Sequence, residues 1–324
     1  MLIYVVNSLE MQIMGGLKMK NKSLTMLLIL TLILTALTSC STTDDLNGNT
    51  DNKTSTENEK SSEKVETVSK DNEPKEKDSQ LSIDEEVVFN EKDIRITLKS
   101  FESGGLFGPE FKLLIDNDSD KNITVQVRNM SINNIMIDPI FSTDVMSGKK
   151  ANDGITIMSR DLELFGIETI KEVEFVFHIF DSDEWETIVD SEVIKIVVKG
   201  AEDYVQIFQE DGELIYDGDF RIIAKNLSGP DFGMIGLDLF LENNSDRYVT
   251  IQTRDLSING FMIDGIFSCD ITPGKKAFDD IAFMESDLLD NGIEKIEEIE
   301  FSFHIFDGES WDTIEDTPTI KINF

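Results

Sequence analysis

Histidine and cysteine, which bind zinc and often take part in nucleophilic catalysis, are rare in this 324-residue chain, which has two of each. The only histidines, His178 and His304, lie in stretches that alternate like β-strands, beside Phe180 and Phe306. A zinc site needs several converging ligands, and an activated nucleophile needs a base within reach. The chain also has no Gly-x-Ser-x-Gly motif and no glycine-rich phosphate loop. We therefore predict no enzymatic activity, metal ligand or cofactor, and interpret the histidines as partly exposed strand residues.

An acidic motif at residues 116–120 is the next candidate. Asp116-x-Asp118-x-Asp120 resembles the start of a calcium-binding loop. Such a loop needs a glycine at its sixth position and an acid at its twelfth, which here are Lys121 and Val127. We interpret the motif as a polar turn, and weak calcium binding is the alternative.

A second acidic pair, Asp181 and Asp183, has the residue types that glycosidases use for acid–base chemistry. The matching segment near the C-terminus reads Asp307-Gly308-Glu309, which breaks the pair. A glycan-active enzyme is therefore a minor alternative.

The N-terminal segment predicts export and lipid attachment. Lysines within 18–22 precede an apolar run over 24–37, shorter than the about 20 residues of a membrane-spanning helix. The run ends in Leu37-Thr38-Ser39-Cys40, which resembles the lipobox cut by lipoprotein signal peptidase. That resemblance implies a diacylglycerol on Cys40. The predicted localisation is extracytoplasmic, anchored to the cell membrane through this cysteine.

Charge narrows the choice of partners. The formal charge is −35, and losing residues 1–39, with three lysines and one glutamate, takes it to −37. Nucleic-acid binding relies on clustered lysine and arginine, so we expect no nucleic-acid partner. If Cys40 carries lipid, Cys269 has no disulfide partner in the chain. We interpret Cys269, which aligns with Thr143, as a small and partly buried residue.

Composition and repetition divide the chain into four parts. Residues 1–39 form the signal peptide, with translation expected to start at Met19. Residues 40–82 are a polar stalk whose composition predicts disorder. A direct repeat with an offset of 126 residues then predicts two domains, 83–198 and 203–324, joined by a short connection. The repeated segments include Phe177–Asp181 with Phe303–Asp307, Gly148–Lys150 with Gly274–Lys276, and Trp185 with Trp311.

Each repeat has the pattern of an all-β domain. Val173, Phe175, Phe177 and Ile179 alternate with less apolar residues, which predicts a strand with one face in a core. About seven short strands separated by turns in some 120 residues indicate a two-sheet sandwich. The other strands are expected at Ile94–Phe101, Phe111–Ile115, Ile123–Val127, Ile135–Phe141, Ile155–Met158 and Val193–Val198, with a helical turn at Asp161–Phe165 ended by Gly166.

The turn Asn117-Asp118-Ser119, the Gly148-Lys149-Lys150 turn and the late aromatic strand resemble the immunoglobulin-like, telokin-type domains of Gram-positive lipoproteins. Most proteins of that kind are uncharacterised. The resemblance covers both repeats and implies tandem immunoglobulin-like β-sandwiches.

One duplicated surface could carry a function. Thr124, Gln126 and Arg128 point outward from a strand, and Trp185 follows an acidic turn. Tryptophan and arginine are frequent interface anchors. We therefore expect a contact surface formed by Arg128, Trp185, Arg254 and Trp311. The predicted function is non-enzymatic binding of an envelope protein or polymer, or of another copy of the chain. A structural envelope spacer without a ligand is the alternative.

Overall fold

The computed structural model describes residues 81–324. The predicted signal peptide, Cys40 and residues 40–80 of the stalk lie outside this range and stay predictions. Residues Lys77–Phe324 form one compact unit. Over the described range, no helix has the length and apolar character needed to cross a membrane.

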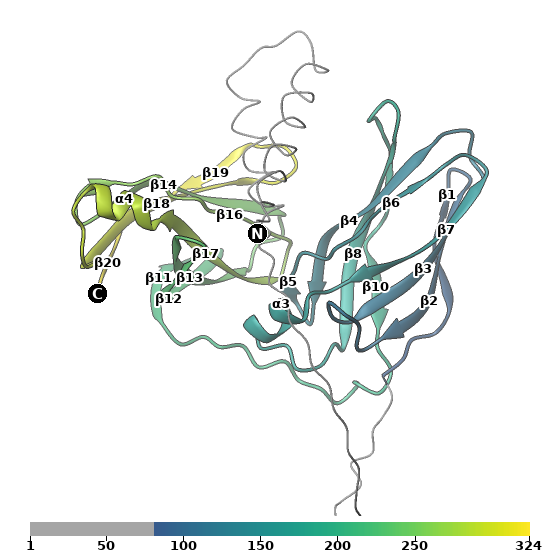
Figure 1. The fold of residues 1–324 in the computed structure, drawn as a ribbon, viewed down its shortest axis with the longest axis horizontal. Helices are drawn as coiled ribbons and strands as arrows, with labels where there is room; N and C mark the ends of the chain where they lie inside the picture. Colours follow the sequence, from purple (N-terminus) through teal and green to yellow (C-terminus); the bar gives the residue numbers. More distant parts are fainter. Residues whose placement is uncertain (1–80) are drawn as a thin grey trace, which may run out of the picture. The chain divides into compact units, whose positions relative to one another are not determined.

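The first repeat is a two-sheet β-sandwich, as the sequence predicted (Figure 1). One sheet has the strand order β1-β2-β3-β7, and in the other β8 pairs with β4, β9 and β10. The first sheet consists of β1 (Glu86–Glu91), β2 (Ile94–Glu102), β3 (Glu110–Asn117) and β7 (Lys149–Thr156). The second consists of β4 (Ile123–Ile132), β5 (Ile135–Met136), β6 (Ser142–Val145), β8 (Glu172–Asp181), β9 (Thr187–Asp190) and β10 (Ile194–Val197), and helix α3 (Ser159–Leu164) precedes β8.

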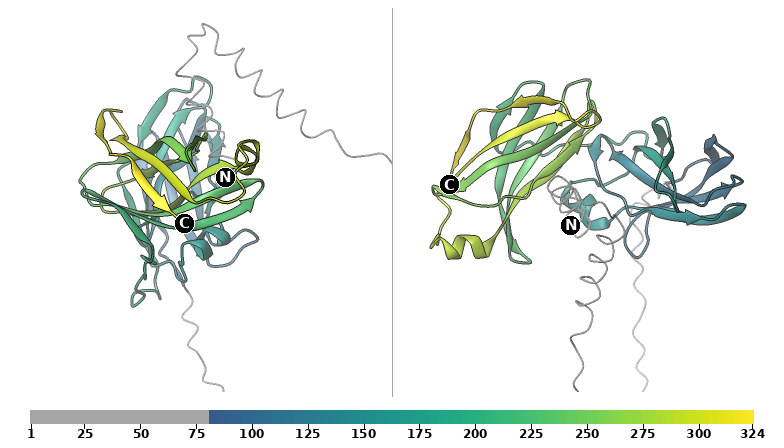
Figure 2. Two further views of the ribbon diagram at one scale, coloured as in Figure 1. Left: turned by 90° about the vertical axis from the view of Figure 1, so that its left-hand side faces the viewer. Right: turned by 90° about the horizontal axis from the view of Figure 1, so that it is seen from above.

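The second repeat has the same arrangement, seen in the green to yellow strands of Figure 2. Its first sheet consists of β11 (Glu213–Asp217), β12 (Phe220–Asp231), β13 (Met234–Asn243) and β17 (Lys276–Met284). Its second consists of β14 (Val249–Ile258), β15 (Phe261–Met262), β16 (Ser268–Ile271), β18 (Glu298–Asp307), β19 (Thr313–Asp316) and β20 (Ile320–Asn323), with helix α4 (Glu285–Asp290) before β18.

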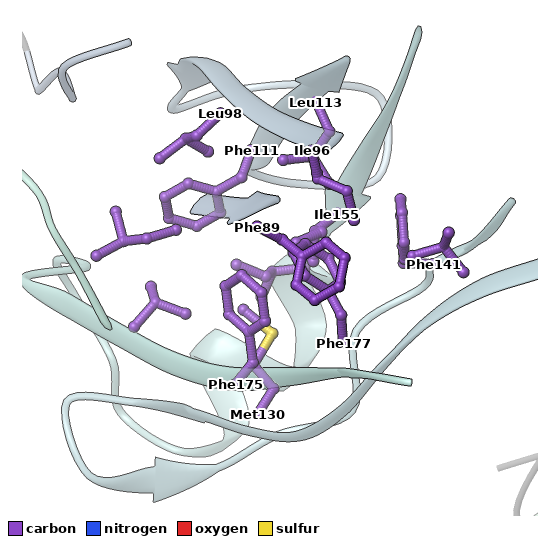
Figure 3. Packing of buried hydrophobic residues seen from close by; sticks show 14 of the residues in the cluster. Phe89, Ile96, Leu98, Phe111, Leu113, Met130, Phe141, Ile155, Phe175 and Phe177 are labelled. Atoms are coloured by element: carbon purple, nitrogen blue, oxygen red, sulfur yellow. The ribbon is translucent and has the colours of Figure 1, made fainter. Parts of the chain in front are cut away.

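Alternating apolar residues build each core. Phe175, Phe177 and Ile179 of β8 are fully buried, and Phe175 and Phe177 lie in one cluster with Phe111 and Leu113 of β3 (Figure 3). The rings of Phe175 and Phe177 meet edge to face, with centroids 5.1 Å apart. The second repeat has its own cluster, around Phe301 and Phe303. Burying one such side chain stabilises the fold by about 1.5–3 kcal/mol, so these strands fix the sandwich.

Several strand boundaries differ from the predictions. The predicted strand Ile135–Phe141 is reduced to Ile135–Met136, because Pro139 has no N–H to continue a ladder. The strand expected at Ile155 begins at Lys149, so the predicted Gly-Lys-Lys turn ends inside β7. Its polar first half was missed because an edge strand can expose such residues. The short strands β1, β6 and β9 were also missed. The helical turn ended by Gly166, at φ 65°, is confirmed.

A longer segment than expected leads into the second repeat. β10 ends at Val197 and β11 begins only at Glu213, whereas the sequence suggested a connection over 199–202. Part of this segment packs on the first repeat: Gln206 donates a hydrogen bond to the Gly166 carbonyl, at 3.0 Å.

The repeats are also joined through a strand. β5 pairs in parallel with β17, so one ten-stranded sheet runs through both repeats.

Candidate functional site

The first repeat has an outer face on β4 and β8, formed by the side chains that alternate with the core residues. The register pairs Thr124 with Phe180, Gln126 with His178, and Arg128 with Val176. We use the name outer face for these side chains together with Trp185, and for their equivalents in the second repeat.

The β8–β9 hairpin places Trp185 at one end of the outer face. Asp181 organises the turn: its carboxylate accepts the N–H groups of Asp183 and Glu184, at 2.9 and 3.2 Å. Lys121 donates a 2.7 Å hydrogen bond to the same carboxylate. This bond and the two backbone bonds hold the pKa of Asp181 below its ordinary value. The Trp185 N–H then donates to the Asp181 carbonyl at 2.8 Å, which closes the turn.

The Trp185 ring lies flat against Phe180 and faces solvent on its other side. The two centroids are 5.6 Å apart, with planes inclined by 22°. Phe180 is buried, whereas Trp185 remains 66 % exposed. A large apolar ring held in place by a buried neighbour is pre-ordered for contact with a partner, because little side-chain freedom is left to lose.

The backbone of Trp185 has a φ of 61°, in the left-handed region that side chains with a Cβ rarely adopt. That conformation costs about 1–2 kcal/mol for a residue other than glycine. We expect Trp185→Gly to be more stable than Trp185→Ala by about 1 kcal/mol, since both lose the ring and only glycine relieves the strain. Urea denaturation measures the difference, and an alanine variant at least as stable as the glycine variant would contradict it.

The second repeat reproduces this geometry. Trp311 stacks on Phe306 at 5.5 Å and 18°, remains 60 % exposed and has a φ of 66°. The Asp307 carboxylate accepts the N–H groups of Glu309 and Ser310. These bonds hold the pKa of Asp307 below its ordinary value.

The histidines belong to the outer face and are engaged with acids. His178 Nδ1 lies 2.5 Å from the Asp190 carboxylate, and His304 Nδ1 lies 2.6 Å from that of Asp316. His178 is buried, deeper than the partly exposed position we expected. Within residues 81–324, no group of three or more His, Cys, Asp or Glu side chains could hold a metal ion. Each histidine–acid pair joins two neighbouring strands, β8 and β9 in the first repeat and β18 and β19 in the second.

The arginines lie on the outer face but away from the tryptophans. Arg128 is four residues from Thr124, whose partner Phe180 carries the Trp185 ring. At about 3.3 Å per residue, the two ends are roughly 13 Å apart along the strand. Partial desolvation lowers the pKa of Arg128, and the nearby Asp190 opposes this effect. The predicted contact surface thus has an aromatic end and a cationic end in each repeat.

The two acidic motifs have structural roles. Asp116 lies 2.5 Å from the Lys150 ammonium, and Asn117 between the acids is fully buried. Of the pair suggested for glycan chemistry, Asp181 organises the hairpin turn, and Asp183 accepts a 3.0 Å hydrogen bond from Asn122. Both carboxylates therefore contribute to turns.

Cys269 is buried on β16, and burial raises its pKa well above the ordinary value. The thiolate, which is the reactive form, is thus disfavoured. Sequence reasoning missed its neighbour Asp279, whose pKa burial raises to about 7. The signal was present, because Asp279 interrupts the buried alternation of Ala277, Ile281 and Phe283.

Comparison with known proteins assigns no family. No family model and no curated protein matches the chain. A structure of the Salmonella enterica SafA pilin in complex with the SafB chaperone is 10% identical, over 66% of this chain and 89% of that chain, with a TM-score of 0.21. The Pseudomonas aeruginosa CupB2 chaperone is 11% identical, over 66% and 92% of the two chains, with a TM-score of 0.17.

The exo-chitosanase CsxA of Amycolatopsis orientalis is 13% identical with a TM-score of 0.21, over 72% of this chain and only 26% of the enzyme. Likenesses this weak identify neither a family nor a ligand.

Proposed function

We propose that this protein is a lipid-anchored, extracytoplasmic binding protein without enzymatic activity, whose two repeats contact a repeated ligand of the cell envelope. The observation that carries the proposal is the duplicated tryptophan. In both repeats the ring is exposed, stacked on a buried phenylalanine and attached to a strained backbone. A strained residue persists only where its surroundings enforce it, and such residues concentrate at functional sites.

Because the outer face is duplicated within one anchored chain, both copies can bind the same ligand at once. Two linked sites turn the second binding event into an intramolecular one, which strengthens overall binding when the ligand repeats. The lipobox-like segment ending in Cys40 supports a membrane anchor, and the polar stalk after it would carry the repeats away from the lipid surface. An envelope polymer or a multimeric envelope protein fits this arrangement.

The tryptophans can be tested with the segment 77–324 and insoluble cell-wall material. We expect Trp185→Ala and Trp311→Ala each to weaken retention, and the double variant to weaken it by about 30-fold or more, as for interface anchors worth at least about 2 kcal/mol. Leu289→Ala, which changes another exposed apolar residue, is the matched control. Retention of the double variant at the wild-type level would refute the proposal.

The anchor is tested separately in cells. We expect Cys40→Ser to move the full chain from the membrane fraction to the soluble fraction and to abolish incorporation of a labelled fatty acid. A Cys40→Ser protein that remains lipidated at the membrane would contradict the predicted attachment site.

A structural spacer is the second candidate, and one observation favours it. The ten-stranded sheet that passes from β4 through β5 into β17 links the repeats by backbone hydrogen bonding. A spacer would need that link and no ligand. Wild-type and double-tryptophan variants that both fail to bind envelope material would support this role.

A further inference from the structure

The contact between the repeats is a strand addition. The Lys276 N–H at the start of β17 donates to the Asn134 carbonyl beside β5, at 2.9 Å, and Lys276 pairs with Ile135. A strand edge of the second repeat is thereby joined to a strand edge of the first. This is the mode in which a sheet edge recruits an extended segment through main-chain hydrogen bonds.

Side chains reinforce this contact. Lys275 donates to Asn134 Oδ1 at 2.9 Å and forms an ion pair with Glu174. The ammonium groups of Lys275 and Lys195 both donate hydrogen bonds to the Glu174 carboxylate. Burial raises the pKa of Glu174, but the two lysines outweigh burial and leave this pKa below its ordinary value. Phe278 stacks on Phe165, with centroids 5.5 Å apart.

The second repeat has its own copy of the receiving edge. β15 is the equivalent of β5, and it ends its sheet in the order β15-β14-β18-β19. Ile135 of β5 is fully buried, whereas Phe261 and Met262 of β15 are 46 % and 68 % exposed. The nearby Glu300, the equivalent of Glu174, pairs with Lys321 at 3.1 Å.

The first repeat has its own copy of the donating edge. β7 ends the order β1-β2-β3-β7, and its start holds the exposed residues Lys149 and Lys150. Lys150 pairs with Asp116 on β3 in the register in which Lys276 pairs with Glu242 on β13. Lys150 has the same position in this register as Lys276, so its N–H also points away from the neighbouring strand β3, toward the edge of the sheet.

We propose that copies of this protein associate head to tail, with the β15 edge of one chain adding to the start of β7 in the next. The pairing would repeat the contact already made inside the chain, with Lys150 opposite Phe261 and Lys149 near Glu300. The two edges differ and lie on different repeats, so the contact is heterologous and extends into chains of molecules. It does not depend on the tryptophans.

This association is weaker than the contact within the chain. The positions equivalent to Phe278 and Phe165 are Asn152 and Asn291, so the aromatic stack is missing. The formal charge of −35 adds repulsion between copies, which salt screens. Association therefore requires high protein concentration, as would exist for molecules confined to a membrane surface.

A cysteine-mixing experiment tests the geometry. Segment 77–324 carrying Lys150→Cys is mixed with the same segment carrying Phe261→Cys at high ionic strength, and oxidised mildly. Paired strand positions are close enough for a disulfide, so we expect a mixed dimer as the main product. Lys150→Cys with Leu289→Cys is the control mixture, and both Leu289 and Phe261 are exposed. Equal yields from the two mixtures would overturn the proposal.

Sedimentation velocity tests the association without a cross-link. We expect wild-type mass to grow with concentration, and Phe261→Glu with Met262→Glu to weaken association by about tenfold or more. Leu289→Glu adds a charge at another exposed position and should associate like wild type. A wild type that stays monomeric throughout, or a double variant that associates equally well, would refute the proposal. Trp185→Ala with Trp311→Ala should associate normally, which separates this test from that of ligand binding.

Discussion

Replacing Asp279 by asparagine is expected to stabilise the second repeat by about 2 kcal/mol above neutral pH. Asp279 occupies a core-facing position of β17, and burial raises its pKa to about 7. The nearby Asp280 and Asp138 carboxylates raise it further. A shift of roughly three units from an ordinary value near 3.9 corresponds to at most about 4 kcal/mol. Because the side chain is not wholly withdrawn from solvent, we expect about half of this.

The direction of the pH dependence follows from proton binding. Between about pH 4 and pH 7, the folded protein keeps the Asp279 proton that the unfolded chain has already lost. Stability from this group is therefore complete below about pH 4, falls as the pH rises, and reaches its minimum above about pH 7. Asparagine cannot ionise, so the variant should lack this decline. Its Oδ1 can still accept the 2.9 Å hydrogen bond from the Asp280 N–H.

Chemical denaturation at pH 5 and pH 8 measures this effect. Asp153→Asn is the matched control, since Asp153 is the equivalent residue of β7 and accepts a hydrogen bond from Thr143. We expect Asp279→Asn to gain stability relative to wild type at pH 8 more than at pH 5. A variant with the pH dependence of wild type would show that Asp279 does not titrate as its burial implies.

Replacing Asn243 by aspartate is expected to destabilise the second repeat by about 3 kcal/mol or more. The side chain is fully buried between β13 and β14. Its Nδ2 donates to the carbonyls of Arg247 and Ile271, at 2.7 and 2.9 Å, and its Oδ1 accepts from the backbone and hydroxyl of Ser245. Aspartate has the same shape but sets an oxygen against two carbonyls. Each buried polar group left without a partner costs about 1–3 kcal/mol, and a charged group costs more.

The repeat supplies both a replicate and a control. Asn117 makes the same bonds in the first repeat, to the carbonyls of Lys121 and Val145 at 2.9 Å, so Asn117→Asp should cost as much there. Asn244 is exposed, and Asp118 is its equivalent, so Asn244→Asp should be nearly neutral. Urea denaturation of all three variants makes the comparison. Equal stabilities of the Asn243 and Asn244 variants would refute the structural role of the buried amide.

The turn at Asn117-Asp118-Ser119 could be predicted from the local sequence, but its buried residue could not. The run Asn117-Asp118-Ser119 indicated a turn between two strands, and a turn is present. The pattern did not show which residue of the turn is buried. Asn117 is held there by a hydrogen bond from its Nδ2 to the carbonyl of Val145, which is 28 positions away. The acidic motif at residues 116–120 was interpreted as a polar turn, with weak calcium binding as the alternative, and the structure shows a hydrogen-bonded turn there.

Binding at the outer faces stays a prediction, but part of their geometry could be predicted from the sequence. Trp185 and Trp311 were recognised from their residue type and repetition, whereas their left-handed backbone and their stacking on Phe180 and Phe306 required the hairpins to be folded. Arg128 was assigned to the same surface, but the strand register places it at the opposite end. Register depends on pairing between distant segments, which a single sequence does not specify.

The duplication, the sandwich class and the alternation that buries Phe175 and Phe177 could be predicted from the sequence, because a strand with one buried face has apolar residues at every second position. Tertiary pairing decided the strand edges that β5 and β17 share and the edges of β7 and β15 that end their sheets, because these contacts join segments far apart in the chain. The two repeats are similar in sequence, yet Ile135 is covered while Phe261 is exposed. The sequences do differ at this contact, where Phe165 stacks on Phe278 and the equivalent positions are Asn291 and Asn152, but only the folded chain shows that these residues lie at a shared strand edge.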